Sequence, residues 1–538
     1  MKKFRKAIAL GLSLITVAGL AACGGEAGMS GADIQDQDGS FPPTEKITLN
    51  FLTHAPSFAP KDLNTKLIVQ RLEEETNVHI NWTCYVDDQF KEKKQLALAK
   101  KELPDAVFDA KMPQYDLLRY AEDGTIIPLE EIIDRYMPNL KKVLEEKPEY
   151  RVLITAPDGH IYSFPWIEEL GTGKEAIQAI GGKPWINKTW LDELGLTMPT
   201  TTDELTEVLK AFKERKPGGR NDILPMSFML KAEDNPNEDV AILLSSFGFG
   251  DNPDHYVVTN DKKVLYTLAD DGIKPGFNWL NDLYSQGLID PEVFTHDWGT
   301  YAAKGNSGRY GVCVGWNASD IATKDDYVPL PPLKGPDGNI NVTRQNAMGL
   351  EVGRAVICST NKNIEITAKY IDRMYDPIQS VQNNWGTYGD EGDNIFELTA
   401  ENTLKHLPIP DGVSPWELRC NTNISGPLAI LDSYYGKYTT TPDDAVAIMD
   451  IVKDIYAPYM KMDFNYPPIF LDMDTQKRII EIETDLKPYA EMKKSDWIMN
   501  GGIDEQWDGY RKELEAKNLS ELLSLKQKGL DDYFANMK

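Results

Sequence analysis

Basic charge, histidine and cysteine are all scarce in this chain, and each shortage excludes a class of function. The 538 residues include 57 Lys and Arg against 84 Asp and Glu, a formal net charge of −27 at pH 7. A surface of that sign repels phosphate backbones, so nucleic acid is excluded as a partner. The six histidines form no HExxH motif, and the five cysteines form no CxxC spacing. We therefore expect no metal and no cofactor.

Signatures of nucleophilic and phosphate chemistry are also missing. No G-x-S-x-G elbow occurs, because Gly305-Asn306-Ser307-Gly308 has the wrong spacing. Gly171-Thr172-Gly173-Lys174 lacks the four-residue gap of a P-loop. A surface glycosidase stays open as an alternative, since two carboxylates far apart in sequence suffice for it. The motifs otherwise favour a binding protein over an enzyme.

A long apolar run occurs only at the beginning of the chain. Basic residues precede the run Ala7 to Leu20, which ends in Leu20-Ala21-Ala22-Cys23. This pattern predicts a signal peptide over residues 1–22. The ending resembles the lipobox of bacterial lipoproteins, which implies that Cys23 is lipidated and becomes the first residue. The alternative is a cysteine behind an uncleaved membrane helix, but Gly24-Gly25 and the unpatterned residues 23–44 are typical of a flexible tether. We expect anchoring at the extracellular face of the membrane.

The other four cysteines show no pairing pattern. Three of them lie in apolar, strand-like runs, and the set is Cys84, Cys313, Cys358 and Cys420. We expect buried free thiols, with disulfides as the alternative.

Strands alternate with helices along the body of the chain, which is too long for a single core. The polar–apolar alternation of Lys46 to Phe51 and of Val78 to Val86 predicts two strands. Helical spacing from Leu63 to Glu75 separates them. Further strands are expected at 106–108, 184–187, 311–315 and 355–359, and helices at 90–102, 188–194, 276–286 and 364–375. The region after Asp443 reads as helical, with a break at Gly501-Gly502. The pattern predicts two α/β lobes, each a mostly parallel sheet flanked by helices.

Several runs together resemble the family 1 extracellular solute-binding proteins, the maltose-binding-like receptors of carbohydrate ABC importers, and most closely their large Gram-positive branch. The runs lie at 71–78, 103–108, 120–129, 185–196 and 497–507. The resemblance implies a type II periplasmic-binding-protein fold with hinge strands and a ligand cleft that closes. It also implies delivery of a solute, expected to be an oligosaccharide, to permease subunits by a monomer.

The resemblance implies the following organisation. Lobe 1 is expected over 45–162 plus about 327–400, and lobe 2 over 163–326 plus about 401–538. We expect the chain to cross between them near Ala156 to Trp166 and near Tyr327 to Arg344, which are rich in Pro and Gly. Some members of the family carry a calcium loop, but the corresponding segment here, Lys213 to Asp222, is rich in cations, so no calcium is expected.

A sugar site needs flat apolar faces and planar polar side chains. Trp316 and Asp109 each follow a predicted strand, Trp166 follows the first predicted crossing, and Trp385 and Tyr388 lie in a Gly-containing loop. Packing, turns or salt bridges could explain each of these residues equally. A peptide or amino-acid receptor remains the main alternative function. The predicted ligand-binding residues are Trp316, Asp109, Trp166, Trp385, Tyr388, His54, Phe58, Arg344 and Arg419.

Overall fold

The computed structural model describes residues 40–537 except 101, 231–235, 323–325 and 411–412. The predicted signal peptide, Cys23 and most of the predicted tether lie outside the described residues. Within the described ranges, no helix is both long enough and apolar enough to cross a membrane.

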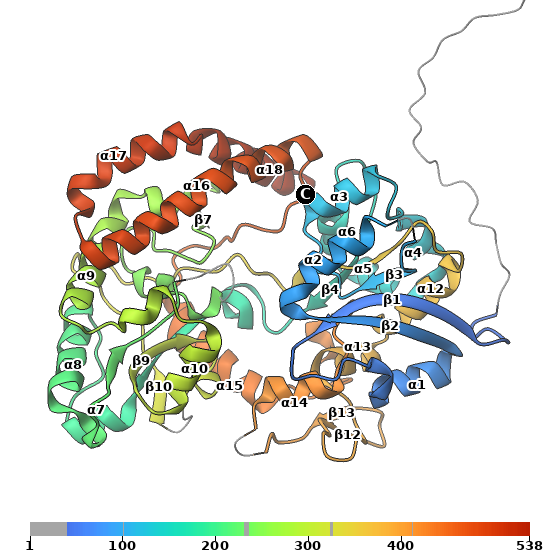
Figure 1. Ribbon diagram of the computed structural model, residues 1–538, viewed down its shortest axis with the longest axis horizontal. Helices are drawn as coiled ribbons and strands as arrows, with labels where there is room; N and C mark the ends of the chain where they lie inside the picture. The colour runs from blue at the N-terminus through green and yellow to red at the C-terminus, as the bar shows by residue number, and fades with distance from the viewer. Residues whose placement is uncertain (1–39, 101, 231–235, 323–325, 411–412, 538) are drawn as a thin grey trace, which may run out of the picture. The chain divides into compact units, whose positions relative to one another are not determined.

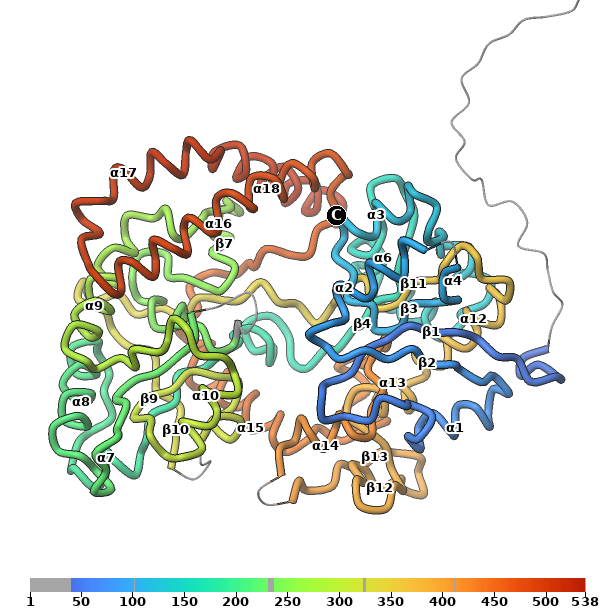
Figure 2. The backbone as a smooth tube through the Cα atoms, viewed as in Figure 1, coloured from blue at the N-terminus to red at the C-terminus, as the bar shows by residue number. Residues whose placement is uncertain are grey.

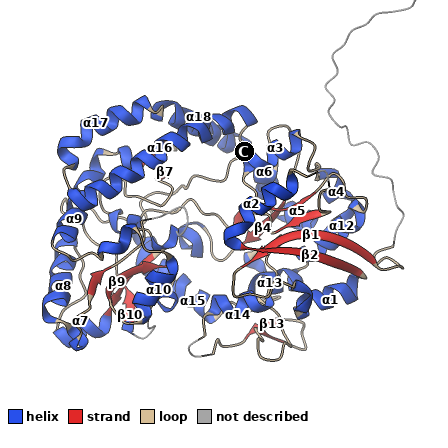
Figure 3. Ribbon diagram, in the orientation of Figure 1, coloured by secondary structure: helices blue, strands red, loops and turns tan. Residues whose placement is uncertain are grey.

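The larger sheet has six strands in the order β14-β4-β11-β3-β1-β2. Figure 1 labels β1 to β4 of this sheet, and Figure 3 draws its strands in red. The neighbours β14/β4, β3/β1 and β1/β2 are parallel, whereas β11 runs antiparallel to both β4 and β3. The strands are β1 (Ile47–Ala55), β2 (Val78–Val86), β3 (Ala106–Phe108), β4 (Phe164–Glu168), β11 (Leu350–Ile357) and β14 (Leu428–Ile430).

Helices cover this sheet and bury its apolar side chains. Leu49 and Phe51 of β1 pack with Ile68 and Leu72 of α1 in one core cluster. On the other face, Leu52 packs with helices α2 and α3. The helices of this lobe are α1 (Leu67–Thr76), α2 (Asp87–Leu98), α3 (Gln114–Glu122), α4 (Glu130–Tyr136), α5 (Pro138–Glu146), α6 (Pro148–Ile154), α12 (Ile364–Asp372), α13 (Pro377–Trp385) and α14 (Pro415–Thr422).

The smaller sheet has the order β10-β5-β9-β6. Only β6 and β9 are parallel among its described pairs, so the expectation of mostly parallel sheets is wrong for this lobe. Periodicity reports which residues are buried and not the direction of the neighbouring strand. The strands are β5 (Lys183–Asn187), β6 (Leu224–Met226), β9 (Tyr310–Gly315) and β10 (Tyr327–Pro329), and two separate hairpins are β7 (Tyr256–Val258) with β8 (Val264–Tyr266) and β12 (Phe396–Leu398) with β13 (Leu404–His406).

A second core joins this sheet to the C-terminal helices. Phe212 and Phe277 pack there with Trp497 and Trp507, all nearly inaccessible to solvent. The predicted break at Gly501-Gly502 separates α16 from α17, because both glycines have positive φ. The remaining helices are α7 (Lys188–Leu194), α8 (Thr202–Arg215), α9 (Lys274–Ser285), α10 (Trp298–Asn306), α11 (Ala318–Ile321), α15 (Asp443–Ile451), α16 (Met473–Asn500), α17 (Ile503–Ala516) and α18 (Leu519–Asn536).

The chain passes between the two sheets three times (Figure 2). The first passage lies between β4 and β5, later than the predicted Ala156 to Trp166. The second lies between β10 and β11, and the third follows β14. The predicted boundaries at 163 and 401 therefore fall before β4 and β14, which both belong to the larger sheet. These strands have five and three residues, too few for a sequence pattern to reveal their sheet.

All four cysteines in the described part of the chain are unpaired. Cys313 and Cys358 are buried, and Cys84 and Cys420 are partly buried.

Candidate functional site

Charged side chains that are buried beside aromatic rings gather at three places near strand ends. We call them the Asp109 cluster, the Glu168 cluster and the Lys183 cluster. Burying a charge is unfavourable unless it is paired, so such groupings call for a physical reason.

The Asp109 cluster begins where β3 ends. Asp109 is 3% exposed and has φ of 49°, a left-handed conformation that turns its carboxylate toward its partners. It forms an ion pair with Arg354 of β11, and its Oδ2 lies 3.1 Å from Nε2 of His54. Burial opposes ionisation of Asp109, but Arg354 and His54 hold its pKa well below the usual range. Nδ1 of His54 in turn lies 2.6 Å from Asp87.

Trp166 adjoins this cluster on β4. The Arg354 guanidinium lies 5.5 Å from the centroid of its ring, a cation–π distance. Arg354 also pairs with Glu351 at 2.7 Å, and Glu351 is the register partner of Trp166. Trp166 is only half-buried, so part of its ring stays accessible.

The Glu168 cluster starts on the same strand. Glu168 lies two residues after Trp166 and so on the same face of β4. Burial raises its pKa to about 7, although Arg419 acts in the opposite direction. Asn384 donates a hydrogen bond of 2.7 Å to Glu168 Oε1.

Aromatic rings and an arginine complete the Glu168 cluster. The Arg419 guanidinium lies 4.5 Å from the centroid of the Trp385 ring and 2.8 Å from Asp444. Trp385 packs edge-on against His406 at 5.8 Å. Arg419 Nε and His406 Nε2 are buried without a hydrogen-bond partner among the described residues. Buried polar atoms are usually hydrogen-bonded, so each such exception calls for an explanation.

The Lys183 cluster lies where β5, an inner strand of the smaller sheet, begins. Lys183 begins β5 and is fully buried, and its Nζ lies 2.8 Å from Gly181 O and 3.9 Å from the centroid of the Trp316 ring. Burial lowers the pKa of Lys183 to about 7. Trp316 directly follows β9 and is half-buried.

Two carboxyls accompany Lys183. Burial raises the pKa of Glu238 to about 7 and that of Asp320 to about 6. Gly182 permits the close approach of the chain around Glu238, since a Cβ at Gly182 would lie 1.7 Å from Asn237 O.

Electrostatic coupling connects the three clusters. Glu351 of the Asp109 cluster contributes to the raised pKa of Glu168. Asp444 and Arg419 of the Glu168 cluster both act on Asp320 of the Lys183 cluster. Together the three clusters combine half-buried tryptophan faces with buried ionisable groups from both sheets.

Comparison with known proteins shows which family this chain belongs to. The model of the family "Bacterial extracellular solute-binding protein" matches residues 55–377. The fructooligosaccharide ABC transporter substrate-binding protein FusA of Streptococcus pneumoniae serotype 4 is 50% identical, over 99% of each chain. This chain is a bacterial extracellular solute-binding protein.

Solved structures agree on the fold of this solute-binding protein. The Streptococcus pneumoniae FusA structure in complex with kestose has a TM-score of 0.88 and 51% identity, covering 91% of this chain and 100% of that one. An "HMO binding" solute-binding protein from Bifidobacterium longum infantis has a TM-score of 0.75 at 24% identity, covering 91% of this chain and 99% of that one. The predicted two-lobed type II fold is thereby confirmed.

The structure of this solute-binding protein gathers most of the predicted ligand residues. His54 contacts Asp109, and Asp109 and Trp166 both contact Arg354. Trp385 contacts Arg419, and Trp316 contacts Lys183. Their contact with ligand stays a prediction. Sequence reasoning missed Arg354, Glu168 and Lys183, for which the available signal was a charged residue inside or beside an apolar strand run, as in Val352-Gly353-Arg354-Ala355-Val356.

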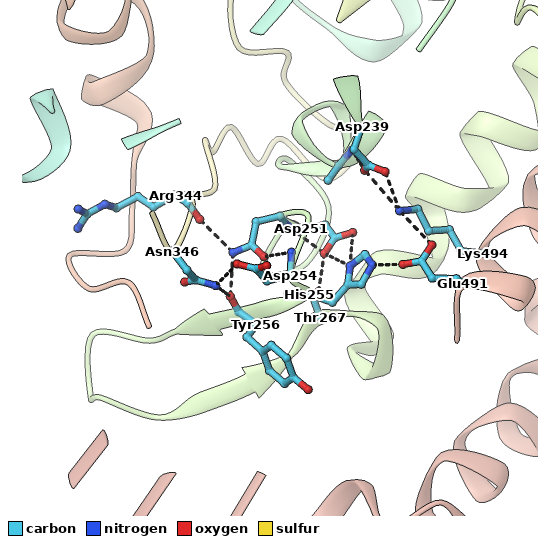
Figure 4. A network of polar contacts seen from close by, with 12 residues as sticks. Asp239, Asp251, Asp254, His255, Tyr256, Thr267, Arg344, Asn346, Glu491 and Lys494 are labelled. Atoms are coloured by element: carbon cyan, nitrogen blue, oxygen red, sulfur yellow. Dashed lines mark hydrogen bonds and ion pairs between the residues drawn. The ribbon is translucent and has the colours of Figure 1, made fainter. Parts of the chain in front are cut away.

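Tyr388 and Arg344 lie elsewhere. The Tyr388 ring packs on the Arg71 guanidinium of α1, 4.1 Å from it. Arg344 donates hydrogen bonds to the carbonyls of Gly173 and Asp463, and its own carbonyl accepts one from Asn252 (Figure 4). Phe58 packs against Trp416.

In the segment Lys213 to Asp222, for which no calcium is expected, Arg220 forms an ion pair with Asp222 at 2.9 Å. Lys216 donates a hydrogen bond of 2.9 Å to the neutral side chain of Asn221. Across the described ranges, no three His, Cys, Asp or Glu side chains are grouped as a metal site would need.

Proposed function

We propose that this solute-binding protein captures a fructooligosaccharide for a bacterial ABC importer. The observation that carries the proposal is the 50% identity, over 99% of both chains, to a protein named for that ligand class. The same importer role is the one that the family resemblance implies.

The chemistry of the three clusters supports a sugar ligand. Trp166, Trp385 and Trp316 offer flat apolar faces at little cost in conformational entropy. Glu168 and Arg419 offer charged partners for hydroxyl groups, which make stronger hydrogen bonds than neutral ones. Neither sheet supplies all of these groups, so a ligand that contacts Trp316 and Trp166 together connects the two lobes.

Binding by lobe closure follows from that division. The three passages between the sheets act as the hinge, and a ligand held by both lobes stabilises the closed arrangement. The closed form is what the permease subunits of the importer recognise. We assign the carboxyls of the three clusters a role in hydrogen bonding alone, so the ligand is released without chemical change. Cys23 carries the lipid that holds the protein at the extracellular face of the membrane.

Isothermal titration calorimetry of Ser40–Lys538, which forms one compact unit, tests the ligand assignment. Kestose and fructo-nystose should bind and be recovered intact, whereas peptides and amino acids should not. Trp316→Ala should weaken binding at least tenfold, about 1.4 kcal/mol. Tyr388→Phe, an aromatic substitution outside the three clusters, serves as the control and should bind normally. Binding of peptides alone would overturn the sugar assignment, and recovery of cleaved sugar would make the protein a glycosidase.

A further inference from the structure

Two large aromatic side chains form an exposed pair on the lobe of the larger sheet. Phe58 is 42% exposed and Trp416 is 53% exposed, and their ring centroids lie 4.8 Å apart at 79°. Single exposed apolar residues are common, but two rings in contact with each other and still half-exposed form a small apolar platform.

Both rings stand on firmly held backbone. The Phe58 loop is fixed by Lys61, whose ammonium donates to the carbonyls of Pro56 and Ala59. At the other side, the buried Lys66 ammonium donates to the carbonyls of Cys420 and Asn423 at 2.9 and 2.6 Å and so fixes the end of α14. The platform is therefore preorganised, which lowers the entropy lost when a ligand docks.

The platform continues the proposed binding site. Trp416 precedes Arg419 by three residues and Cys420 by four, so the three side chains share one face of α14. Arg419 belongs to the Glu168 cluster. This face of α14 thus reaches the Glu168 cluster through Arg419, with Trp416 one turn further out.

We infer that Phe58 and Trp416 form an outer subsite for sugar units beyond the third of a longer oligosaccharide. This inference rests on the proposed function. The buried clusters hold the first units, and the outer rings pack on the apolar faces of the units that follow. The platform thereby sets the preference of the protein for chain length.

The test compares kestose, a trisaccharide, with the longer fructo-nystose. Covering about 50 Å² of the Trp416 ring corresponds to about tenfold in affinity. Trp416→Ala should therefore raise the Kd for fructo-nystose about tenfold and leave the Kd for kestose within about twofold. Trp416→Phe, which keeps a ring, should retain most of the affinity for the longer sugar. Met492→Ala is the matched control, because Met492 is 55% exposed on α16 and lies outside the clusters.

Each outcome decides between distinct conclusions. Equal losses for both sugars, or no loss for either, would overturn the outer subsite while leaving the proposed function intact. Failure of the unmodified protein to bind either sugar would overturn the proposed function itself. A change in oligomeric state of Trp416→Ala, measured by light scattering, with unchanged sugar binding would assign the platform to a protein contact and also overturn the subsite.

Discussion

The buried carboxyl of Glu168 lowers the stability of the folded protein when it is ionised, and a role in ligand binding would explain why it is present. Its pKa is about 7 in the folded protein because of burial, against 4.5 for an ordinary glutamate. Above pH 4.5 the unfolded chain releases this proton freely and the folded chain does not, so the free energy of unfolding falls as the pH rises through 7. Glu168→Gln should therefore be about 3 kcal/mol more stable than the unmodified protein at pH 8, and equally stable at pH 4. Urea unfolding at both pH values measures this difference.

At pH 8, where Glu168 is mostly ionised, the same substitution should weaken ligand binding, since a neutral amide replaces a charged acceptor. The adjacent Glu169 provides the control. Partial burial opposes its ionisation, but Lys147 and Tyr150, which contact it at 2.8 and 2.6 Å, lower its pKa below the ordinary value. Glu169→Gln should lower stability at neutral pH and leave sugar affinity unchanged. A Glu168→Gln protein that is less stable than the unmodified protein at pH 8 would mean that Glu168 is a structural residue.

At the scale of elements, an ionic network fixes α16 to the smaller lobe (Figure 4). His255 Nδ1 lies 2.8 Å from Asp251 Oδ1, and its Nε2 bonds to Glu491 of α16. Burial opposes the charged imidazole, but the two carboxylates raise the pKa of His255 to about 9. This contribution to stability is fully present below pH 6.5 and is lost as the pH rises through 9.

His255→Gln should thus lower the free energy of unfolding by about 3 kcal/mol at pH 6, with a smaller deficit at pH 9.5. Urea unfolding at the two pH values is the measurement. His160→Gln makes a fair comparison, since His160 contacts Glu130 at 2.6 Å but its side chain is 46% exposed. That surface pair should change stability by less than about 1 kcal/mol. A deficit for His255→Gln that does not depend on pH would show that packing, and not charge, holds α16.

Periodicity predicted the long elements and could not predict the polar contacts. The alternation of Val78 to Val86 is a local property, and this strand was correctly predicted. The end of α1 at Asn77, which has φ of 52°, is local in the same sense. The three-residue β14 and the antiparallel direction of β11 depend on partners far along the chain. For the same reason the sequence indicated Asp109 and Trp166 separately, whereas Arg354, which joins them, is separated from both by more than 180 residues.

At the scale of the whole molecule, the division of the site between two sheets has a measurable consequence. Trp166 stands on the larger sheet and Trp316 follows β9 of the smaller sheet, and both are half-buried. A ligand present at about a hundred times its Kd should add about 2.7 kcal/mol to the free energy of unfolding. Trp166→Ala and Trp316→Ala, each assayed at that same ligand concentration, should both reduce this gain, because a ligand that connects the lobes needs a platform on each.

Differential scanning calorimetry of Ser40–Lys538 with and without kestose measures the gain for each variant. Tyr388→Phe should show the full gain, since Tyr388 lies on Arg71 away from the three clusters. If only one tryptophan variant lost the gain, the ligand would occupy a single lobe and could not drive closure. Loss in both variants would establish that the two lobes act together, because only a ligand held from both sides makes the stability of the complex depend on residues from two different sheets.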